Sequence, residues 1–246
     1  MNNPVKAKLL SGQPSYGAWL NLNSTLSAEV TAAAGFDWLT VDAEHSAWDM
    51  PLIADTFRAI EARGVVPFVR TWDHDPVTLN RLLDAGAMGI VIPHVCTPEQ
   101  AQKLADAMRY PPVGKRSAGT GRIAVHGSEY RNTINDQVLC IPQIEDTEGV
   151  ENAEAIMAVE GVDVGFIGPG DLSLEMGVPA GSPKHEAAVH KILDACKKAG
   201  KPAGYPARTP ELAKQRRDEG FVMLDIASDL RLLQVGAEQI LAELKG

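Results

Sequence analysis

Two acidic residues that follow apolar stretches provide the first chemical signal in this sequence. Glu145 follows the apolar run 138–142, and Asp171 follows the apolar run 162–167. A carboxylate at the end of a buried strand is costly to desolvate unless a positive charge lies beside it. If the two strands are neighbours in one sheet, the acids meet each other, and a divalent cation is the usual way to hold them. Two solvated loop acids are the alternative interpretation.

Other side chains that could do chemistry lie at or just after the ends of the remaining apolar runs. In a barrel of parallel strands, the carboxyl ends of all strands meet at one rim, and that rim carries the active site. Acids, a histidine and an arginine would converge there, which favours a metal site over solvated loop acids. In chain order the residues are Trp19, Asp42, Glu44, His45, Arg70, His94, Gln143, Glu145, Asp171 and Arg208.

Eight apolar runs could form the strands of such a barrel. Most are continuous and not alternating, as expected of parallel strands buried on both faces. Helical patterns separate them; one begins at Asp75-Pro76, a capping residue followed by proline, and ends at Gly86. This alternation predicts a (β/α)8 TIM barrel in a single domain over residues 1–246, with an open doubly wound sheet as the competitor. The strand candidates are residues 16–22, 38–42, 65–70, 89–94, 138–145, 162–167, 202–206 and 221–226.

The connection between the fourth and fifth strand candidates is irregular. Residues 109–135 contain Pro111-Pro112 and Gly119-Thr120-Gly121, which are typical of loops. A connection of this length in a compact domain is usually functional or mobile. We therefore expect it to form part of the active-site wall.

Composition restricts the partners and the location. The 246 residues include 23 basic and 32 acidic side chains, a net charge of −9, and no basic stripe. These features argue against a nucleic-acid or anionic-membrane partner. The three cysteines, Cys96, Cys140 and Cys196, have no metal-binding spacing, which favours reduced thiols. Without a signal-like or membrane-spanning apolar stretch, we expect a soluble cytoplasmic protein.

Taken in order, the rim residues make the sequence similar to a known family. From about Gly17 to Ala227 it resembles the HpcH/HpaI family of metal-dependent, class II pyruvate aldolases. Each motif alone is weak, whereas the combination in this order is specific. The sequence departs from the family at 116–119 and at 204–206, where an acceptor aldehyde would sit. The motifs are Gly17-Ala18-Trp19-Leu20, Asp42-Ala43-Glu44-His45, Val69-Arg70, Gln143-Ile144-Glu145 and Gly168-Pro169-Gly170-Asp171-Leu172-Ser173.

The resemblance implies a role for several of these residues. It implies a divalent metal on Glu145 and Asp171, with water and a 2-oxo acid completing the coordination shell. Arg70 would contact the keto oxygen of the substrate, and His45 would transfer a proton. The turn whose backbone N–H groups would hold the substrate carboxylate consists of Gly168, Pro169, Gly170 and Asp171.

Elementary chemistry supports the same roles. Removing a proton beside a ketone creates an enolate, whose negative charge collects on the keto oxygen. A chelated metal and a guanidinium both stabilise charge at that oxygen, and Arg70 stays charged beside a cation. Histidine is the side chain that exchanges a proton most readily near neutral pH, so His45 can carry the proton. Oxygen ligands favour Mg²⁺ or Mn²⁺ over zinc and leave Co²⁺ open.

The remaining rim residues have supporting interpretations. Gln143 is expected to orient a carboxylate beside it. Asp42 and Glu44 are expected to fix His45 and Arg70 in place, and an ion pair with either acid would give Arg70 a structural role as well. Trp19 fits a core residue and a pocket lid equally well.

Four functions for the whole protein follow from this site. The leading hypothesis is a class II aldolase that joins or splits a pyruvate-like 2-oxo acid and an aldehyde. A Schiff-base aldolase needs a lysine at the carboxyl end of a strand, and no lysine lies there; Lys201, for example, precedes the seventh strand candidate. Another enolate-forming lyase or a decarboxylase on the same metal platform stays open, as does a barrel that only binds an oxo acid.

Two features predict a homo-oligomer, either a trimer or a hexamer. Asp84 lies at the end of its predicted helix, on the amino-terminal face of the barrel, and within its own subunit it is out of reach of His45. The resemblance nevertheless places an acid here beside the catalytic histidine, which only a neighbouring subunit could supply. The final helix, residues 229–244, carries more apolar side chains than one barrel face needs, and the resemblance implies its exchange between subunits.

Overall fold

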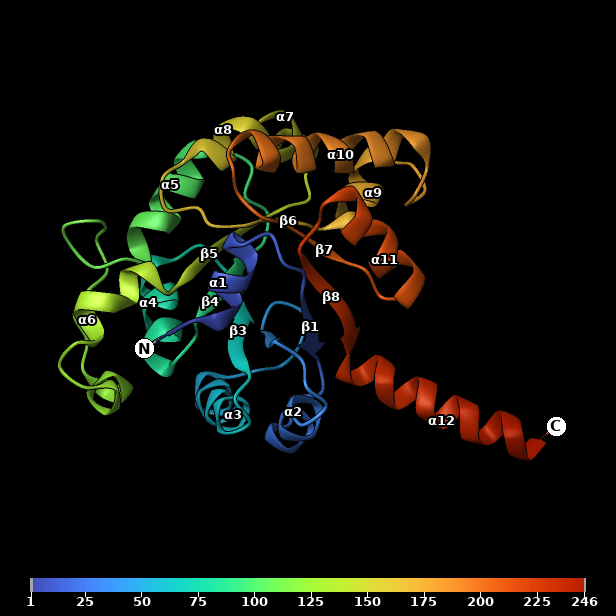
Figure 1. The fold of residues 1–246 in the computed structure, drawn as a ribbon, viewed down its shortest axis with the longest axis horizontal. Coiled ribbons are helices and arrows are strands. Elements are labelled where there is room, and N and C mark those ends of the chain that lie inside the picture. The colour runs from blue at the N-terminus through green and yellow to red at the C-terminus, as the bar shows by residue number, and fades with distance from the viewer. Residues whose placement is uncertain (1, 246) are drawn as a thin grey trace.

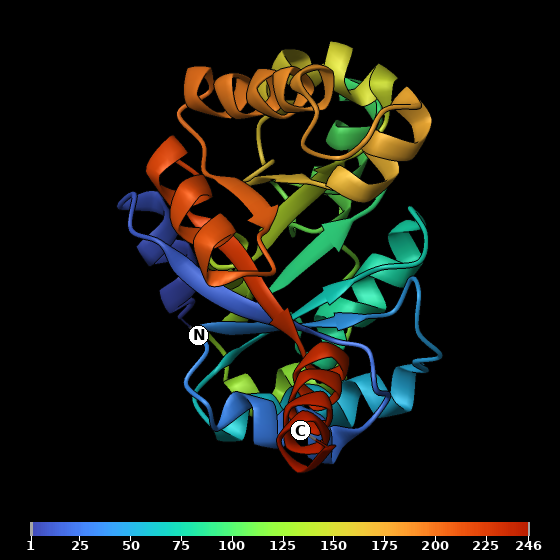
Figure 2. The same cartoon turned by 90° about the vertical axis from the view of Figure 1, so that its right-hand side faces the viewer.

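Residues 2–245 of the computed structural model form a closed barrel of eight parallel strands, with helices around its outside (Figure 1, Figure 2). Each strand pairs with the next in sequence, and β8 returns to pair with β1. The predicted (β/α)8 barrel is therefore confirmed, and the open doubly wound sheet, which would leave two unpaired edges, is excluded. The assignment of residues 1–246 to a single domain stays a prediction; Met1 and Gly246 lie outside the described residues.

All eight strands lie within one or a few residues of their predicted positions. Their side chains are buried almost throughout, because one face fills the barrel interior and the other packs against the helices. His94 and Glu145, predicted as strand residues, lie just beyond the strand ends, at the rim. The strands are β1 (Ser15–Leu20), β2 (Trp38–Asp42), β3 (Val66–Arg70), β4 (Gly89–Ile92), β5 (Leu139–Ile144), β6 (Gly165–Ile167), β7 (Ala203–Pro206) and β8 (Met223–Ser228).

The helices begin where capping residues and prolines predict. The side chains of Asp49, Asp75, Thr97 and Thr209 accept backbone N–H groups at the starts of α3, α4, α5 and α11, and each helix has proline in its first turn. The helix predicted from Thr147 is divided in two at Asn152, and α1, α6 and α9 were not predicted. The helices are α1 (Pro4–Leu10), α2 (Thr25–Ala32), α3 (Met50–Ala62), α4 (Pro76–Ala85), α5 (Pro98–Ala107), α6 (Tyr130–Thr133), α7 (Thr147–Glu151), α8 (Ala153–Ala158), α9 (Pro169–Met176), α10 (Pro183–Lys198), α11 (Pro210–Glu219) and α12 (Asp229–Lys245), with 3-10 turns at Gly121–His126 and Ile134–Asp136.

The long connection 109–135 does not form part of its own active-site wall, so that expectation is wrong. It follows α5 and leads into the start of β5, and chain segments that run from a helix to the next strand lie on the amino-terminal face. Arg109, at its beginning, pairs with Asp163, two residues before β6 starts, at 2.7 Å. The connection is therefore on the side of the barrel opposite to the strand ends.

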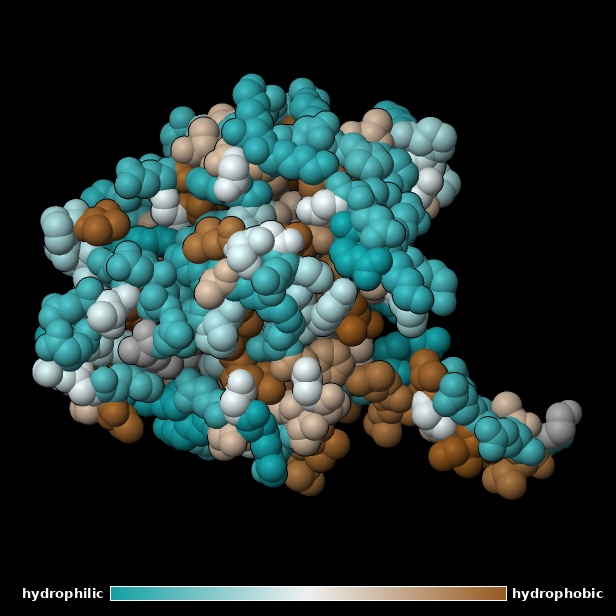
Figure 3. Space-filling view, in the orientation of Figure 1, coloured by the Kyte–Doolittle hydropathy of each residue, from teal (hydrophilic) through white to brown (hydrophobic). Residues whose placement is uncertain are grey.

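The last helix, α12, points away from the barrel (Figure 1). In the space-filling view it carries hydrophobic side chains on its surface (Figure 3), and only Asp229, its first residue, is buried. No helix within residues 2–245 is long and apolar enough to cross a membrane. The exposed apolar side chains of α12 are Leu230, Leu232, Leu233, Ile240, Leu241 and Leu244.

Gly17 allows β1 and β2 to pack, and this can be tested. A Cβ at Gly17 would overlap the indole of Trp38, which is fully buried and stacks on Phe68 at a centroid distance of 5.6 Å. Gly17→Ala should therefore lower the free energy of unfolding in urea by about 1–3 kcal/mol or more, as overpacking does.

The control is Gly236→Ala on α12, where an added Cβ meets no described atom within 4 Å. Because alanine favours helix over glycine, we expect this variant to be unchanged or stabilised by up to about 1 kcal/mol. Equal stability of Gly17→Ala and the wild type would contradict the packing argument.

Candidate active site

A cavity of about 500 Å³ opens at the carboxyl ends of the strands. The catalytic, metal-binding and substrate-binding residues predicted from the sequence line it together, with the exception of Asp84. They come from the ends of β1, β2, β3, β5 and β6, so strand order alone brings them together. These lining residues are Trp19, His45, Arg70, Gln143, Glu145, Gly168, Pro169, Gly170 and Asp171.

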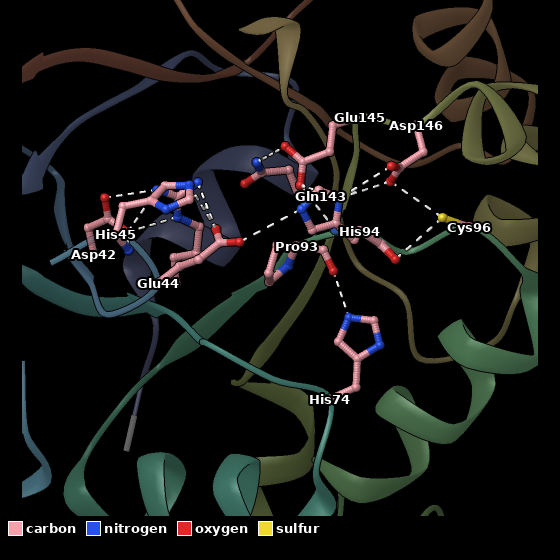
Figure 4. A network of polar contacts seen from close by, with 11 residues as sticks. Asp42, Glu44, His45, His74, Pro93, His94, Cys96, Gln143, Glu145 and Asp146 are labelled. Atoms are coloured by element: carbon pink, nitrogen blue, oxygen red, sulfur yellow. Dashed lines mark hydrogen bonds and ion pairs between the residues drawn. The ribbon is translucent and has the colours of Figure 1, made fainter. Parts of the chain in front are cut away.

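Glu145 is the most deeply buried acid of this cavity, with 1% of its surface exposed. The Gln143 side-chain amide donates a hydrogen bond to its Oε2, and the backbone N–H of His94 donates to its Oε1 at 3.0 Å (Figure 4). Burial raises the pKa of Glu145 to about 7 despite these hydrogen bonds, and the charge of Asp171 adds to the increase. Within residues 2–245 no lysine or arginine pairs with Glu145.

Gly168 makes room for this carboxylate. A Cβ at Gly168 would collide with the Glu145 side chain and with the Gln143 amide. Pro169 follows as the first residue of α9, so the chain turns directly from β6 into a helix, and Asp171 lies in its first turn. The first backbone N–H groups of a helix have no partner inside it, so those of Gly170 and Asp171 are available to an anion.

Arg70 is held on three sides. Its Nε and Nη2 donate to the two carboxylate oxygens of Asp42 at 2.9 and 2.8 Å, and its Nη1 pairs with Glu44 at 3.0 Å. The guanidinium also lies 4.3 Å from the centre of the Trp19 ring. Such a forked, stacked arrangement fixes the orientation of an arginine, and lysine could not reproduce it. Asp42 and Glu44 thus support Arg70, and Trp19 is a cavity wall as well as a core residue.

His45 lies at the open side of the cavity, with 61% of its side chain exposed. Its Nε2 is 3.6 Å from Glu44, the same acid that pairs with Arg70. Its backbone N–H donates to Asp42 at 3.4 Å. Because Asp42 also pairs with Arg70, this hydrogen bond positions the loop after β2 beside Arg70. The imidazole is accessible to a substrate, and among the described residues only the contact with Glu44 restrains its orientation.

His94 lies between Glu44 on one side of the site and Glu145 and Asp146 on the other (Figure 4). No role was predicted for it from the sequence. Its ring lies 3.8 Å from Glu44 and 3.1 Å from Asp146. Burial opposes protonation of His94, but the hydrogen bond to Asp146 and the surrounding acids outweigh it and raise its pKa. Its φ of +52°, unusual for a residue other than glycine, aims the backbone N–H at Glu145.

The carboxylates fit a divalent cation. Within residues 2–245 Glu145 has no lysine or arginine partner and only a 3.7 Å contact with Nδ1 of His94, and the Oε1 atom of Gln143 beside it is buried without a hydrogen bond. Within residues 2–245 no three His, Cys, Asp or Glu side chains gather into a complete metal site. The chain would therefore supply Glu145 and Asp171 and leave the other positions to water and substrate, as Mg²⁺ sites commonly do.

Asp84 is not part of this cavity. It lies in the last turn of α4, where its Oδ1 pairs with Nη2 of Arg116 at 2.7 Å. Arg116 belongs to the connection 109–135, and its side chain is fully buried against Tyr110 and Tyr130. Asp84 is thus held in place on the amino-terminal face, away from the His45 of its own subunit.

Two charged residues near the cavity had no predicted role, Arg208 and Asp225. Arg208 follows β7 and lines the cavity, and Asp225 lies inside β8, fully buried. Nε of Arg208 is 3.8 Å from Oδ2 of Asp225. An acid within an otherwise apolar run near the carboxyl end of the eighth strand candidate was the available signal for Asp225.

Comparison with known proteins agrees with this geometry. Residues 15–234 match the family model described as HpcH/HpaI aldolase/citrate lyase. The chain is 39% identical to the hydroxypyruvate/pyruvate aldolase of Chromohalobacter salexigens, over 99% of this chain and 98% of the relative. It is 37% identical to the 4-hydroxy-2-oxo-heptane-1,7-dioate aldolase of Klebsiella pneumoniae, over 98% and 94%.

A solved structure extends the comparison to three dimensions. The crystal structure of an HpcH/HpaI aldolase/citrate lyase family protein from Burkholderia cenocepacia superimposes with a TM-score of 0.95, at 36% identity and 100% coverage of both chains. The chain therefore belongs to the HpcH/HpaI aldolase/citrate lyase family. The predicted family and the predicted enzyme class, a carbon–carbon lyase of aldolase type, are confirmed.

The buried Asp225 predicts a dependence of stability on pH. Burial raises the pKa of Asp225 to about 8, although the charge of Arg208 opposes the shift. Because the unfolded chain releases this proton near its ordinary pKa of about 4, stability falls as pH rises between about 4 and 8, by up to about 1.4 kcal/mol per pH unit. Asp225→Asn should remove this cost, so it should stabilise the protein more at pH 8 than at pH 5.

Thermal or urea unfolding of both proteins across this pH range measures the difference. Asp218→Asn removes one negative charge from an exposed position and serves as the control. A stability difference between Asp225→Asn and the wild type that does not change with pH would contradict the prediction.

Proposed function

We propose that this protein is a metal-dependent, class II aldolase that joins or splits a pyruvate-like 2-oxo acid and an aldehyde. The observation that carries the proposal is Glu145, a carboxylate buried without a lysine or arginine partner among the described residues, in the same cavity as Asp171, Arg70 and His45. Relatives named hydroxypyruvate/pyruvate aldolase and 4-hydroxy-2-oxo-heptane-1,7-dioate aldolase support a pyruvate-like donor. The three free cysteines support a reducing, cytoplasmic location.

Glu145 and Asp171 would hold the cation, which is Mg²⁺ or Mn²⁺, with Co²⁺ as a third option. When bound, the cation acts as a Lewis acid toward the keto oxygen of the substrate. Gln143 and the backbone N–H of His94 hold Glu145 in one orientation. The free N–H groups of Gly170 and Asp171 bind the substrate carboxylate.

Arg70 supplies fixed positive charge where the enolate develops. Asp42, Glu44 and Trp19 hold the guanidinium in place before substrate binds, so little reorganisation is needed during the reaction. His45 accepts a proton in one direction and returns it in the other. A barrel that only binds an oxo acid would not need a fixed arginine and an accessible histidine in the same cavity.

The proposal includes a homo-oligomer, trimer or hexamer, in which Asp84 of one subunit orients His45 of its neighbour. Two observations support it. Within residues 2–245 the exposed imidazole of His45 has no ionisable partner closer than 3.6 Å, and Asp84 is held on the opposite face by Arg116. The apolar side chains of α12 offer the surface that an exchanged helix would bury.

Exchange of the pyruvate methyl protons with D₂O tests the donor half of the proposal without any acceptor. We expect exchange to stop in excess chelator and to return with Mg²⁺, Mn²⁺ or Co²⁺. Glu145→Gln and Asp171→Asn should weaken metal binding measured by calorimetry. Arg70→Gln and His45→Ala should keep the metal but slow exchange by about 10²-fold or more, the scale of an electrostatic or general-base group.

Lys184→Gln, on α10 outside the catalytic cavity, controls for the loss of a surface charge and should exchange at the wild-type rate. Full exchange in excess chelator would refute the metal, and unchanged exchange in both Arg70→Gln and His45→Ala would refute their roles.

Mixing of inactive variants tests the shared site. Asp84→Asn and His45→Ala subunits, dissociated and reassembled together, should regain activity, because some sites combine an intact His45 with the neighbour's intact Asp84. In a random equal mixture, about a quarter of the sites would combine an intact His45 with an intact Asp84.

Sedimentation of the mixture shows whether mixed oligomers have formed. No recovery in demonstrably mixed oligomers, a fully active Asp84→Asn enzyme, or a stable and active monomer would each argue against a site shared between subunits.

A further inference from the structure

Arg208 occupies a position between two cavities. It follows β7 and lines the catalytic cavity with Arg70 and His45. It also lines an adjacent cavity of about 840 Å³ that borders His45 and Arg70 as well and extends toward the start of α12. A molecule that reaches from the reacting atoms beside Arg70 into the second cavity passes Arg208.

The guanidinium of Arg208 is available to a ligand, whereas the guanidinium of Arg70 is paired with two acids. The guanidinium of Arg70 pairs with the carboxylates of Asp42 and Glu44 at N···O distances of 2.8 to 3.0 Å. The ion pair of Arg208 with Asp225, at 3.8 Å, is longer than a hydrogen bond and is its only one among the described residues. With 62% of its side chain exposed, Arg208 can turn its forked donors toward a ligand.

Asp225 does not neutralise this charge at neutral pH. It is fully buried, and its Oδ2 atom, the one nearest to Arg208, has no hydrogen-bond partner. Burial raises the pKa of Asp225 to about 8, so the carboxyl is mostly protonated at pH 7. Arg208 is then a cation at the cavity without an ionised partner.

The second cavity has polar groups along about half of its wall. Asn21, Asn23, Ser46 and Gln234 contribute amide and hydroxyl groups. Arg231 is a third arginine of the lining beside Arg70 and Arg208, and Asp42, which pairs with Arg70, is its only carboxylate. The exposed apolar residues among its lining are Ala47 and Leu230. The polar groups of this lining offer hydrogen bonds to a short, charged or hydroxylated chain.

We propose that Arg208 binds an anionic group at the far end of the acceptor aldehyde, so that the preferred acceptors carry a carboxylate or a phosphate ester. The proposal rests on the aldolase function proposed above and specifies its acceptor. The aldehyde carbon lies beside Arg70 and His45, and the anion lies on the guanidinium of Arg208. Arg208 is a specificity-determining residue and takes no part in forming the enolate.

The test compares acceptors that differ only in charge. With pyruvate as the donor, kcat/KM is measured for 4-oxobutanoate against its uncharged methyl ester, and for glyceraldehyde 3-phosphate against glyceraldehyde. The wild type should prefer the charged member of at least one pair. Arg208→Gln should lower kcat/KM for that member by about tenfold to a hundredfold, the scale of one hydrogen-bonded charge, and change the neutral member little.

The pair that depends on Arg208 identifies the anion as a carboxylate or a phosphate. Arg217→Gln is the matched control, because it removes the same charge from α11, outside both cavities, where Arg217 pairs with Asp218. It should leave both ratios unchanged. An equal effect of the two variants would show a general influence of net charge and would overturn the assignment.

Pyruvate proton exchange in D₂O separates this inference from the function on which it rests. Arg208→Gln should exchange at the wild-type rate, because the donor site is intact. Normal exchange with no preference for either anionic aldehyde, or with a preference that survives Arg208→Gln, overturns the acceptor proposal alone. Absence of exchange in the metal-loaded wild type overturns the aldolase proposal and the acceptor proposal together.

Discussion

The rest of the site depends on a buried carboxylate that has no lysine or arginine beside it among the described residues. Glu145 is enclosed by the barrel and faces the charge of Asp171, and its raised pKa measures the resulting electrostatic cost. Several local features exist only to accommodate this group: the missing Cβ of Gly168, the left-handed backbone of His94 and the amide of Gln143. Binding a cation would turn this unfavourable arrangement into a favourable one.

Positive charge is arranged around this carboxylate in two different ways. Arg70 is buried, paired and stacked, so its position is fixed and its net field is moderated by Asp42 and Glu44. Arg208 is exposed and weakly paired, so it can move to meet a ligand. A fixed cation suits the charge that develops at a reacting atom, and a movable one suits substrates of different length.

The sequence predicted the barrel and most of the cavity because both follow from strand ends. Continuous apolar runs located the eight strands, and the polar residues after them had to meet at one rim, as Glu145 and Arg70 do. Properties that depend on distant contacts could not be predicted in this way. The pairing of Arg208 with Asp225 joins two strands, the φ of His94 is set by its neighbours, and the connection 109–135 was assigned to the wrong face because its length was considered without its position after α5.

The protruding last helix, α12, is synthesised after all eight strands of the barrel. The barrel closes when β8 pairs with β1, and β8 ends at Ser228, so every strand leaves the ribosome before the body of α12 does. In the proposed oligomer, folding of the barrel and covering of α12 would therefore be separate events. Until α12 is covered, a new chain exposes a row of leucine and isoleucine side chains to other proteins. In that oligomer, a higher concentration of released chains would shorten the interval, because one copy of α12 would meet another subunit before other proteins bind it.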